Sequence, residues 1–298
     1  MADPRSVSVQ SVLFGNDAYE ILRAAQAMAN SVKWARSDGL VGAWTLLLGD
    51  CSAEPVLGAD ILEEIRAVVA AEAGELIYRV FGKNLGSAAG HNALAALSGA
   101  ELILILNPDA IVAPDTVRSL TRAVTGSVGI AEARQIPIEH PKDFEVNTGN
   151  TSWASTACAL TPRAAFDTIG GFDSDTFFLY CDDVDYSWRL RLAGYRVVFE
   201  PSARVFHDKR LTQTGDWPPT SAEVYYSAEA ALFIAHKYSH PEIVEKLIAQ
   251  FQNEGTDAVL KAVAAFHLKS KSGSLPAPLD AGHLVGQFIG DKYAVHRF

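Results

Sequence analysis

The segment 101–110, ELILILNPDA, constrains the fold of this chain more than any other stretch. Its apolar residues run without interruption through Leu102–Leu106, and such a run is typical of a strand buried on both faces. Strands of this kind belong to parallel sheets that helices cover on both sides. Ligands of such sheets lie beyond the carboxyl ends of the strands. Asp109, two residues past Asn107, is therefore placed at a candidate binding edge.

Short β-rich runs alternate with helical patterns throughout the first half of the chain. This alternation predicts an α/β fold with a mostly parallel central sheet flanked by helices. The expected strands are Val7–Phe14, Trp44–Leu48, Leu76–Phe81 and Leu102–Leu106, and the expected helices are Ala18–Ser31, Ala59–Ala73 and Ser87–Leu97.

The second half begins with a strand near Val128–Ala133 and a polar loop over Pro137–Thr151, whose length is typical of a functional loop. A strand over Ser155–Leu160 follows, and Thr161 is the expected N-cap of a short helix. From Ser221 the pattern is helical, with a break at Pro241. We therefore expect two regions, an α/β region over residues 1–215 and a helical C-terminal region with a linker and tail over 216–298.

The chain has 298 residues and a net charge of -10, from 25 Lys+Arg and 35 Asp+Glu. So acidic a protein is a poor general binder of nucleic acid. No apolar stretch reaches the roughly 18–20 residues that cross a bilayer, and the N-terminus lacks the apolar core of a signal peptide. We expect a cytoplasmic protein, with peripheral association at the inner membrane face as an alternative, and buried thiols at the three cysteines.

Three carboxylates, Asp182, Asp183 and Asp185, follow an aromatic run near the middle of the chain. Two unit charges about 4 Å apart repel by roughly 4 kcal/mol at an effective dielectric of 20. The cluster opens a helix expected to reach about Leu192, and the helix dipole offsets only part of that repulsion. Arg189, four residues after Asp185, can pair with it. The remaining repulsion indicates a further cation or a metal ion.

Three segments in order resemble glycosyltransferase family 2, in particular its bacterial rhamnosyl- and galactofuranosyl-transferase-like members with the GT-A fold. NLGSAAGHN (84–92) resembles the N-x-G-x-x-x-G-x-N element of the family. LILILNPDA resembles its strand that ends in a metal-binding acidic motif. GGFDSDTFFLYCDDVDYSWRLRLAGYRVVFEPSARVFH resembles its G-G-F-D, acidic, R-x-x-G-Y and terminal-His elements. The resemblance covers about residues 7–207.

The resemblance implies inverting transfer of a sugar from a nucleoside diphosphate to an acceptor hydroxyl. It implies a divalent cation, Mn²⁺ or Mg²⁺, with Asp109 and His207 as ligands, since these ions prefer oxygen donors. Asn107 stands where many relatives carry an aspartate. Asp183 is the expected general base, with Asp182 beside it as the second catalytic acid.

The same resemblance places the donor and acceptor. The expected donor is a UDP- or dTDP-linked sugar, and the expected acceptor is a hydroxyl-bearing glycan or a lipid-linked molecule. Gly49 departs from the family, because relatives commonly carry an aspartate there. In this chain that aspartate is either displaced to Asp50 or absent. The expected donor-binding residues are Phe14, Gly15, Asn16, Asp50, Asn84, Gly86 and Asn107. Apart from the resemblance, Trp153 and Tyr180 are the expected acceptor-binding residues, because their aromatic rings are able to stack on sugar rings.

Several alternatives stay open at this stage. Gly49 and the single aspartate of the N-P-D element also fit a nucleotide-sugar-binding or scaffold protein with a decayed site. A nucleotidyltransferase is a further alternative, although the chain lacks the basic glycine-rich N-terminal loop expected for one. Core packing is an equally good role for Trp153 and Tyr180. The C-terminal helices are a candidate surface for self-association or membrane contact, with capping of the catalytic core as the default.

Overall fold

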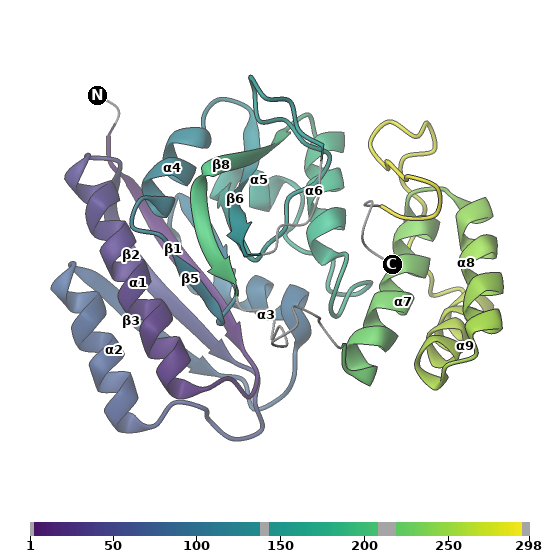
Figure 1. Ribbon diagram of the computed structural model, residues 1–298, viewed down its shortest axis with the longest axis horizontal. Helices are drawn as coiled ribbons and strands as arrows, with labels where there is room; N and C mark the ends of the chain where they lie inside the picture. The colour runs from purple at the N-terminus through teal and green to yellow at the C-terminus, as the bar shows by residue number, and fades with distance from the viewer. Residues whose placement is uncertain (1–2, 138–142, 208–218, 294–298) are drawn as a thin grey trace.

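A computed structural model describes residues 3–137, 143–207 and 219–293 of the protein (Figure 1). These residues form an eight-stranded sheet in the order β3-β2-β1-β4-β7-β6-β8-β5. The strands are β1 (Arg5–Leu13), β2 (Val41–Asp50), β3 (Gly74–Val80), β4 (Leu102–Leu106), β5 (Ala110–Val112), β6 (Val128–Ile136), β7 (Cys158–Pro162) and β8 (Arg196–His207).

The first four strands form the parallel half of the sheet. β1 lies parallel to both β2 and β4, and β2 lies parallel to β3. All five residues of β4 are buried, as its continuous apolar run predicts. The expected α/β architecture is therefore confirmed, and the carboxyl ends of these strands meet at one edge of the sheet.

The second half of the sheet is mixed. β7 lies antiparallel to its neighbours β4 and β6, whereas β6 lies parallel to β8. The short strand β5 lies antiparallel to β8, with Ala110 opposite His207. This register brings the residue that follows Asp109 against the end of β8, almost a hundred residues later in the chain.

Helices cover both faces of the sheet (Figure 1). Buried side chains of α1 (Ala18–Ser37), α2 (Ala59–Ala71) and α4 (Thr116–Ala123) share one apolar core with the sheet. Side chains of α3 (Gly86–Ala95), α5 (Arg163–Thr168) and α6 (Asp182–Leu192) form a second core on the other face. The active-site candidates on α3 and α6 therefore belong to the same face.

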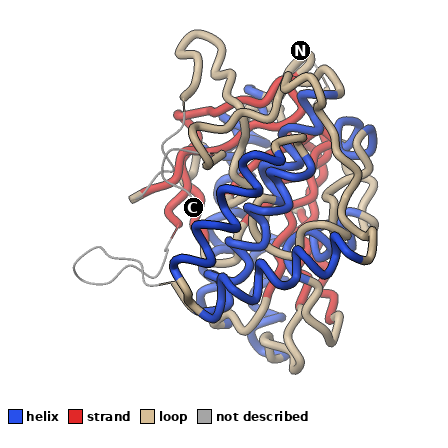
Figure 2. Tube along the Cα trace, turned by 90° about the vertical axis from the view of Figure 1, so that its right-hand side faces the viewer, coloured by secondary structure: helices blue, strands red, loops and turns tan. Residues whose placement is uncertain are grey.

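The C-terminal region consists of α7 (Ser221–Lys237), α8 (Pro241–Glu254) and α9 (Asp257–Lys271). Figure 2 looks onto this side and shows the helices packed beside one another. Their apolar faces form a third core that also includes Val184 and Trp188 of α6. The expected region boundary at 215/216 lies outside the described residues. Within the described residues, no helix is long and apolar enough to cross a membrane.

Two local expectations in the second half are wrong. The strand expected over Ser155–Leu160 begins at Cys158, because its ladder with β4 pairs Cys158 with Leu106 and runs on to Pro162. The N-cap of α5 is Pro162 rather than Thr161. The hydroxyl of Thr161 instead donates to the carbonyl oxygen of Gly129 at 2.6 Å, inside the sheet.

Candidate active site

Three polar side chains meet where β4 and β8 end, and we call them the strand-exit cluster: Asn107, Asp109 and His207. Oδ1 of Asp109 lies 3.3 Å from Nε2 of His207, and Nδ2 of Asn107 lies 3.2 Å from the same nitrogen. The Asp109 side chain is 35% exposed and that of His207 only 12%. The carboxylate is thus open to a ligand, while the imidazole is held from behind.

Gln135, at the end of β6, sets the orientation of that imidazole. Its Oε1 lies 2.9 Å from Nδ1 of His207, and its Nε2 donates to Oγ of Ser155 at 3.2 Å. Since an amide oxygen only accepts, Nδ1 of His207 donates, and in the neutral imidazole Nε2 then presents a lone pair. Such an outer partner is the usual support of a metal-binding histidine.

The strand-exit cluster fits a divalent cation. The lone pair of His207 Nε2 and the carboxylate of Asp109 are both acceptors, and two acceptors 3.3 Å apart need a proton or a cation between them. Oxygen and imidazole donors suit Mn²⁺. No group of three or more His, Cys, Asp or Glu side chains gathers as a metal site anywhere in 3–137, 143–207 or 219–293. The protein would therefore supply two ligands, and the phosphates of a bound nucleotide would supply others.

The second group of candidates is the acidic turn, Asp182 and Asp183, which opens α6. Both side chains are buried, with exposed fractions of 5% and 6%. The two residues before the turn, Tyr180 and Cys181, both have left-handed backbones, with φ of 66° and 53°. A left-handed conformation costs a non-glycine residue roughly 1–3 kcal/mol. Strain of this kind is common at functional sites, and here it directs the chain into the acidic turn.

Burial and, to a smaller extent, the charge of Asp183 raise the pKa of Asp182 to about 7, against the opposing effect of a hydrogen bond from Ser87. Oδ2 of Asp182 has no hydrogen-bond partner among the described residues. Oδ1 of Asp183 accepts from the backbone N–H of Val184 at 2.9 Å. Near neutral pH the turn therefore gains and loses a proton readily, as acid–base chemistry requires.

Asp185, the third acid, has a structural role, as its pairing with Arg189 predicts. Its side chain is fully buried, and its Oδ2 lies 2.7 Å from Nε of Arg189. Its Oδ1 lies 2.5 Å from Nζ of Lys237 in α7 and also accepts from the hydroxyl of Tyr238 at 3.1 Å. Lys237, which comes from the C-terminal region, is a cation for Asp185, whereas the cation expected for Asp182 and Asp183 stays a prediction.

A path of hydrogen bonds and adjacent residues connects the acidic turn to the strand-exit cluster. The carbonyl oxygen of Asp183 accepts from the hydroxyl of Ser187 at 2.8 Å, and that hydroxyl accepts from the N–H of Ala154 at 3.0 Å. The next residue, Ser155, accepts from Gln135, which holds His207. The two groups of candidates are therefore parts of one supported framework.

The expected nucleotide side lies after β1 and β2. The N–H of Gly15 donates to Oγ of Ser52 at 2.9 Å, which joins the loops after the two strands. Gly15 has a φ of +67°, and the N–H of Phe14 donates to Oδ1 of Asn16 at 2.8 Å. The Phe14 ring is 59% exposed, so it is available to a ligand.

The expected contact between Asp50 and the nucleotide base is not supported, because this carboxylate is fully buried. It accepts from the N–H groups of Ser52 and Val56 at 2.9 and 2.8 Å and from the hydroxyl of Tyr78. Burial alone would raise the pKa of Asp50, but these hydrogen bonds outweigh it and lower that pKa. Asp50 therefore shapes the loop after β2. An aspartate at Gly49 would require the Phe81 ring to shift, since an added Cβ would lie 2.8 Å from it.

Asn84 and Gly86 shape the start of α3. Oδ1 of Asn84 accepts from the N–H of Gly86 at 3.0 Å. Gly86 has a φ of +72°, and a Cβ there would lie 2.3 Å from the carbonyl oxygen of Phe178. The next N–H, that of Ser87, donates to the same oxygen at 3.0 Å. Glycine thus permits the backbone of α3 to approach the segment that leads into the acidic turn.

The two expected acceptor-binding aromatics are differently placed. Trp153 is only 1% exposed, and its ring packs edge-on against Tyr293 at 5.8 Å between centroids. A ring so buried has little surface for stacking on a sugar, which favours core packing, and the same residue lines the cavity beside the end of α6. Tyr180 is half-buried next to the acidic turn and packs against the third core.

The fold defined by this sheet and its helices is that of the GT-A glycosyltransferases. A mannosyltransferase from Pyrobaculum calidifontis, solved with GDP-Man and Mn²⁺, has a TM-score of 0.56 at 18% identity over 92% of this chain and 77% of that one. GalNAc-T7, solved with UDP, GalNAc and Mn²⁺, has a TM-score of 0.63 at 11% identity over 92% of this chain and 55% of that one. At such identities the likeness shows the fold alone.

The sequence itself is similar to rhamnosyltransferases. It is 31% identical over 140 residues to an N-acetylglucosaminyl-diphospho-decaprenol L-rhamnosyltransferase of Mycobacterium tuberculosis. That match covers 44% of this chain and 42% of the relative, so it spans less than half of either protein. No protein-family model matches the chain. The resemblance to rhamnosyltransferase-like proteins that the three motifs predict is confirmed.

Three residues of the framework were not predicted. Gln135 and Ser52 support His207 and Gly15 through single hydrogen bonds, and Lys237 neutralises the buried Asp185. Polar residues at the ends of expected strands could have indicated Gln135 and Ser52. Nothing in the sequence around Lys237 distinguishes it from a surface lysine.

Proposed function

We propose that this protein is an inverting, metal-dependent glycosyltransferase, which moves a sugar from a nucleoside diphosphate to an acceptor hydroxyl. The observation that carries the proposal is the connection of the strand-exit cluster to the acidic turn through Ser187, Ala154, Ser155 and Gln135. The GT-A fold and the similarity to a rhamnosyltransferase support it.

In this proposal the strand-exit cluster holds the diphosphate end of the donor. Asp109 and His207 would bind a divalent cation, which as a Lewis acid would stabilise negative charge on the leaving diphosphate. Nδ2 of Asn107 lies 3.2 Å from Nε2 of His207, and this amide would donate to a phosphate oxygen of the donor. Gly15, Asn16 and Ser52 form the floor for the nucleoside.

The acidic turn supplies the base. Asp183 would accept the proton of the attacking hydroxyl on the face of the sugar opposite to the diphosphate, which gives inversion at the anomeric carbon. Burial raises the pKa of Asp182 beside it to about 7, so near neutral pH this carboxyl is only partly charged while the acceptor binds. A positioned base of this kind contributes about 10²–10⁴-fold to the rate.

The donor and acceptor classes are also part of the proposal. We favour a UDP- or dTDP-linked sugar, and the GDP-Man and UDP of the two structural neighbours show that the fold accepts different nucleotides. The name of the mycobacterial relative describes a sugar on a diphospho-lipid as its acceptor. An acceptor of that kind, or a hydroxyl-bearing glycan, suits this chain, acting at the cytoplasmic face of a membrane.

A thermal-shift panel of nucleoside diphosphates and sugar nucleotides, with and without Mn²⁺, tests donor binding, because a bound ligand stabilises the folded state. We expect the shift to require Mn²⁺ and to be lost in Asp109→Asn but kept in Asp183→Asn. Transfer should fall about 10²–10⁴-fold in Asp183→Asn. Asp60→Asn, on the exposed start of α2, is the matched control.

Three results would each contradict a different part of the proposal. Full transfer in excess chelator would exclude the cation. Transfer by Asp183→Asn at the wild-type rate would exclude this base. Donor binding without transfer or hydrolysis across a broad acceptor panel would favour a nucleotide-sugar-binding protein instead.

A further inference from the structure

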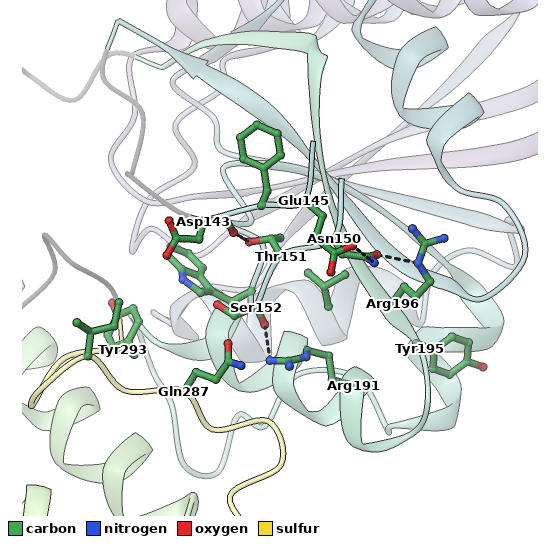
Figure 3. A pocket seen from close by; sticks show the side chains of 14 residues that line it. Asp143, Glu145, Asn150, Thr151, Ser152, Arg191, Tyr195, Arg196, Gln287 and Tyr293 are labelled. Atoms are coloured by element: carbon green, nitrogen blue, oxygen red, sulfur yellow. Dashed lines mark hydrogen bonds between the residues drawn. The ribbon is translucent and has the colours of Figure 1, made fainter. Parts of the chain in front are cut away.

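A cavity of about 720 Å³ lies beside the C-terminal end of α6, and Trp153 is among the residues that line it. One wall is the segment 143–152, the other is the C-terminal tail around Gln287 and Tyr293, and the floor is the end of α6 and the start of β8. Figure 3 shows the cavity from close by, with Arg191 extending from α6 toward Ser152. A volume of this order is typical of ligand sites in proteins.

The wall formed by segment 143–152 is built by its own hydrogen bonds. The N–H of Glu145 donates to the carbonyl oxygen of Asn150 at 2.8 Å, and the Thr151 hydroxyl donates to the carbonyl oxygen of Asp143 at 2.9 Å. Arg196 of β8 donates to Oδ1 of Asn150 at 2.7 Å. A wall fixed in this way is formed before any ligand arrives, which lowers the entropic cost of binding.

Arg191 gives the cavity an unused hydrogen-bonding group. Its Nη1 donates to the carbonyl oxygens of Ser152 and Val285, at 3.4 and 3.1 Å, and so joins the two walls. Its side chain is half-buried. Among the residues that the structure describes, no carboxylate forms an ion pair with Arg191, and its Nε and Nη2 have no acceptor. Because Arg191 lines the cavity, these two groups are available to a ligand there.

The lining indicates a neutral ligand rich in hydroxyl groups. Two arginines, Arg191 and Arg196, are balanced by the carboxylates of Asp143 and Glu145, so an anionic ligand gains little net attraction. An acyl chain in the cavity would form no hydrogen bonds with the polar side chains that line it, which is energetically costly. Gln287 offers both a donor and an acceptor, and no hydrogen bond within the described chain uses either. Neutral sugars match such a mixture of donors and acceptors.

The geometry points to a second glycan-binding site in this cavity, one that holds a part of the acceptor glycan away from the reacting hydroxyl; this role rests on the proposed function. Arg191 follows Asp183 by eight residues on α6, which is about 12 Å along the helix axis. A glycan held at both ends of α6 would bind more tightly than at either end alone, because the second contact is intramolecular.

The test measures binding of neutral di- and trisaccharides of hexose and 6-deoxyhexose units, without donor, by saturation-transfer NMR and calorimetry. We expect Gln287→Ala to weaken this binding about fivefold through the lost hydrogen bonds, while Mn²⁺-dependent binding of UDP or dTDP stays unchanged. Phe144→Ala, which removes a partly exposed ring from the cavity wall, should weaken it similarly. Gln250→Ala, an exposed glutamine on α8, is the control.

Wild-type affinity for the saccharides in both cavity variants, or the absence of saccharide binding by the wild-type protein, would overturn the site. Tighter binding of uronic-acid-containing or phosphorylated saccharides would overturn the neutral class. These outcomes are separate from failure of the proposed function. Saccharide binding at the cavity without any turnover of nucleotide sugars would overturn the acceptor role and the glycosyltransferase proposal, and would leave a carbohydrate-binding site.

Discussion

Asp182 is buried in the first turn of α6 beside a second carboxylate, and this placement ties its protonation to folding. Its pKa rises from 3.8 in the unfolded chain to about 7 in the folded protein, because of burial and the charge of Asp183. Between these values the folded protein binds more protons than the unfolded chain does. The stability that Asp182 contributes is therefore fully present below pH 3.8 and is lost as the pH rises through about 7.

We predict that Asp182→Asn is more stable than the wild type at pH 8, by on the order of 2 kcal/mol, and less active. The amide removes one of two adjacent buried charges. Urea unfolding at pH 5 and pH 8 measures the effect, and the stability difference between the two proteins should be smaller at pH 5. Equal differences at both pH values would show that Asp182 does not titrate in this range.

His91, on α3, is a buried titratable group whose pH dependence has the opposite sign. Burial lowers its pKa from 6.5 to about 4, and its Nδ1 has no hydrogen-bond partner among the described residues. The unfolded chain therefore binds more protons than the folded protein below pH 6.5. The contribution of His91 to stability is present above that pH and is lost as the pH falls toward 4.

We predict that His91→Leu becomes more stable relative to the wild type as the pH falls, by about 3 kcal/mol between pH 7 and pH 4. Urea unfolding of both proteins at several pH values measures this difference. His267→Leu, at an exposed position of α9, should show no such trend. The slopes of Asp182 and His91 oppose one another, so the wild-type curve alone would conceal both.

At the scale of elements, α6 and α7 are joined by one buried ionic network. Lys237 of α7 lies 2.5 Å from Asp185 of α6 and 2.6 Å from Asp173, and its side chain is only 6% exposed. Arg189 and Tyr238 complete the environment of Asp185. Because Asp185 lies in the same helical turn as Asp183, this network supports the position of the proposed base.

Removing one partner of this network should be costly. We predict that Lys237→Met destabilises the protein by about 3–5 kcal/mol, since it leaves a buried carboxylate without its cation. The pair Lys246–Asp291, whose lysine is 61% exposed, is the control, and Lys246→Met should cost about 1 kcal/mol or less. Urea unfolding measures both. Adding Asp185→Asn to Lys237→Met should recover part of the loss, and failure to recover any would mean that charge is not the cause.

At the scale of the whole molecule, the sequence predicted the parallel half of the sheet well and the mixed half less well. β4 is buried along its whole length, so its apolar run is unambiguous. β8 mixes buried and exposed positions over twelve residues, and β5 has only three residues. Neither sequence therefore shows the regular alternation of apolar and polar residues that identifies a strand. Asp109 and His207 were paired through family motifs, and the β5–β8 register brings them together.

The framework of the site depends on contacts between residues far apart in the chain, and local sequence patterns do not predict such contacts. Lys237 and Asp173 are 64 residues apart in the chain, and an isolated lysine in a helical pattern is usually exposed. Asp50 was expected to face the nucleotide, but its hydrogen bonds to Val56 and Tyr78 turn it inward. Trp153 has no sequence feature that separates a sugar platform from a core ring. The roles of such residues depend on how deeply their side chains are buried, and burial is known only from the folded structure.

The third core joins the C-terminal helices to α6, so we expect the α/β region and the C-terminal region to unfold together. Phe233 of α7 is 1% exposed in this core, packs near Phe266, and has Nζ of Lys269 at 4.5 Å from its ring centroid. We predict that Phe233→Ala costs about 3–5 kcal/mol. Far-UV circular dichroism and tryptophan fluorescence should still report one urea transition at a lowered midpoint.

The control is Leu268→Ala on α9, where the leucine is 69% exposed, and it should change the free energy of unfolding by about 0.5 kcal/mol or less. Two separated transitions, with the fluorescence of the α/β region unaffected by Phe233→Ala, would mean instead that the C-terminal region folds independently and that Lys237 only docks it onto the acidic turn.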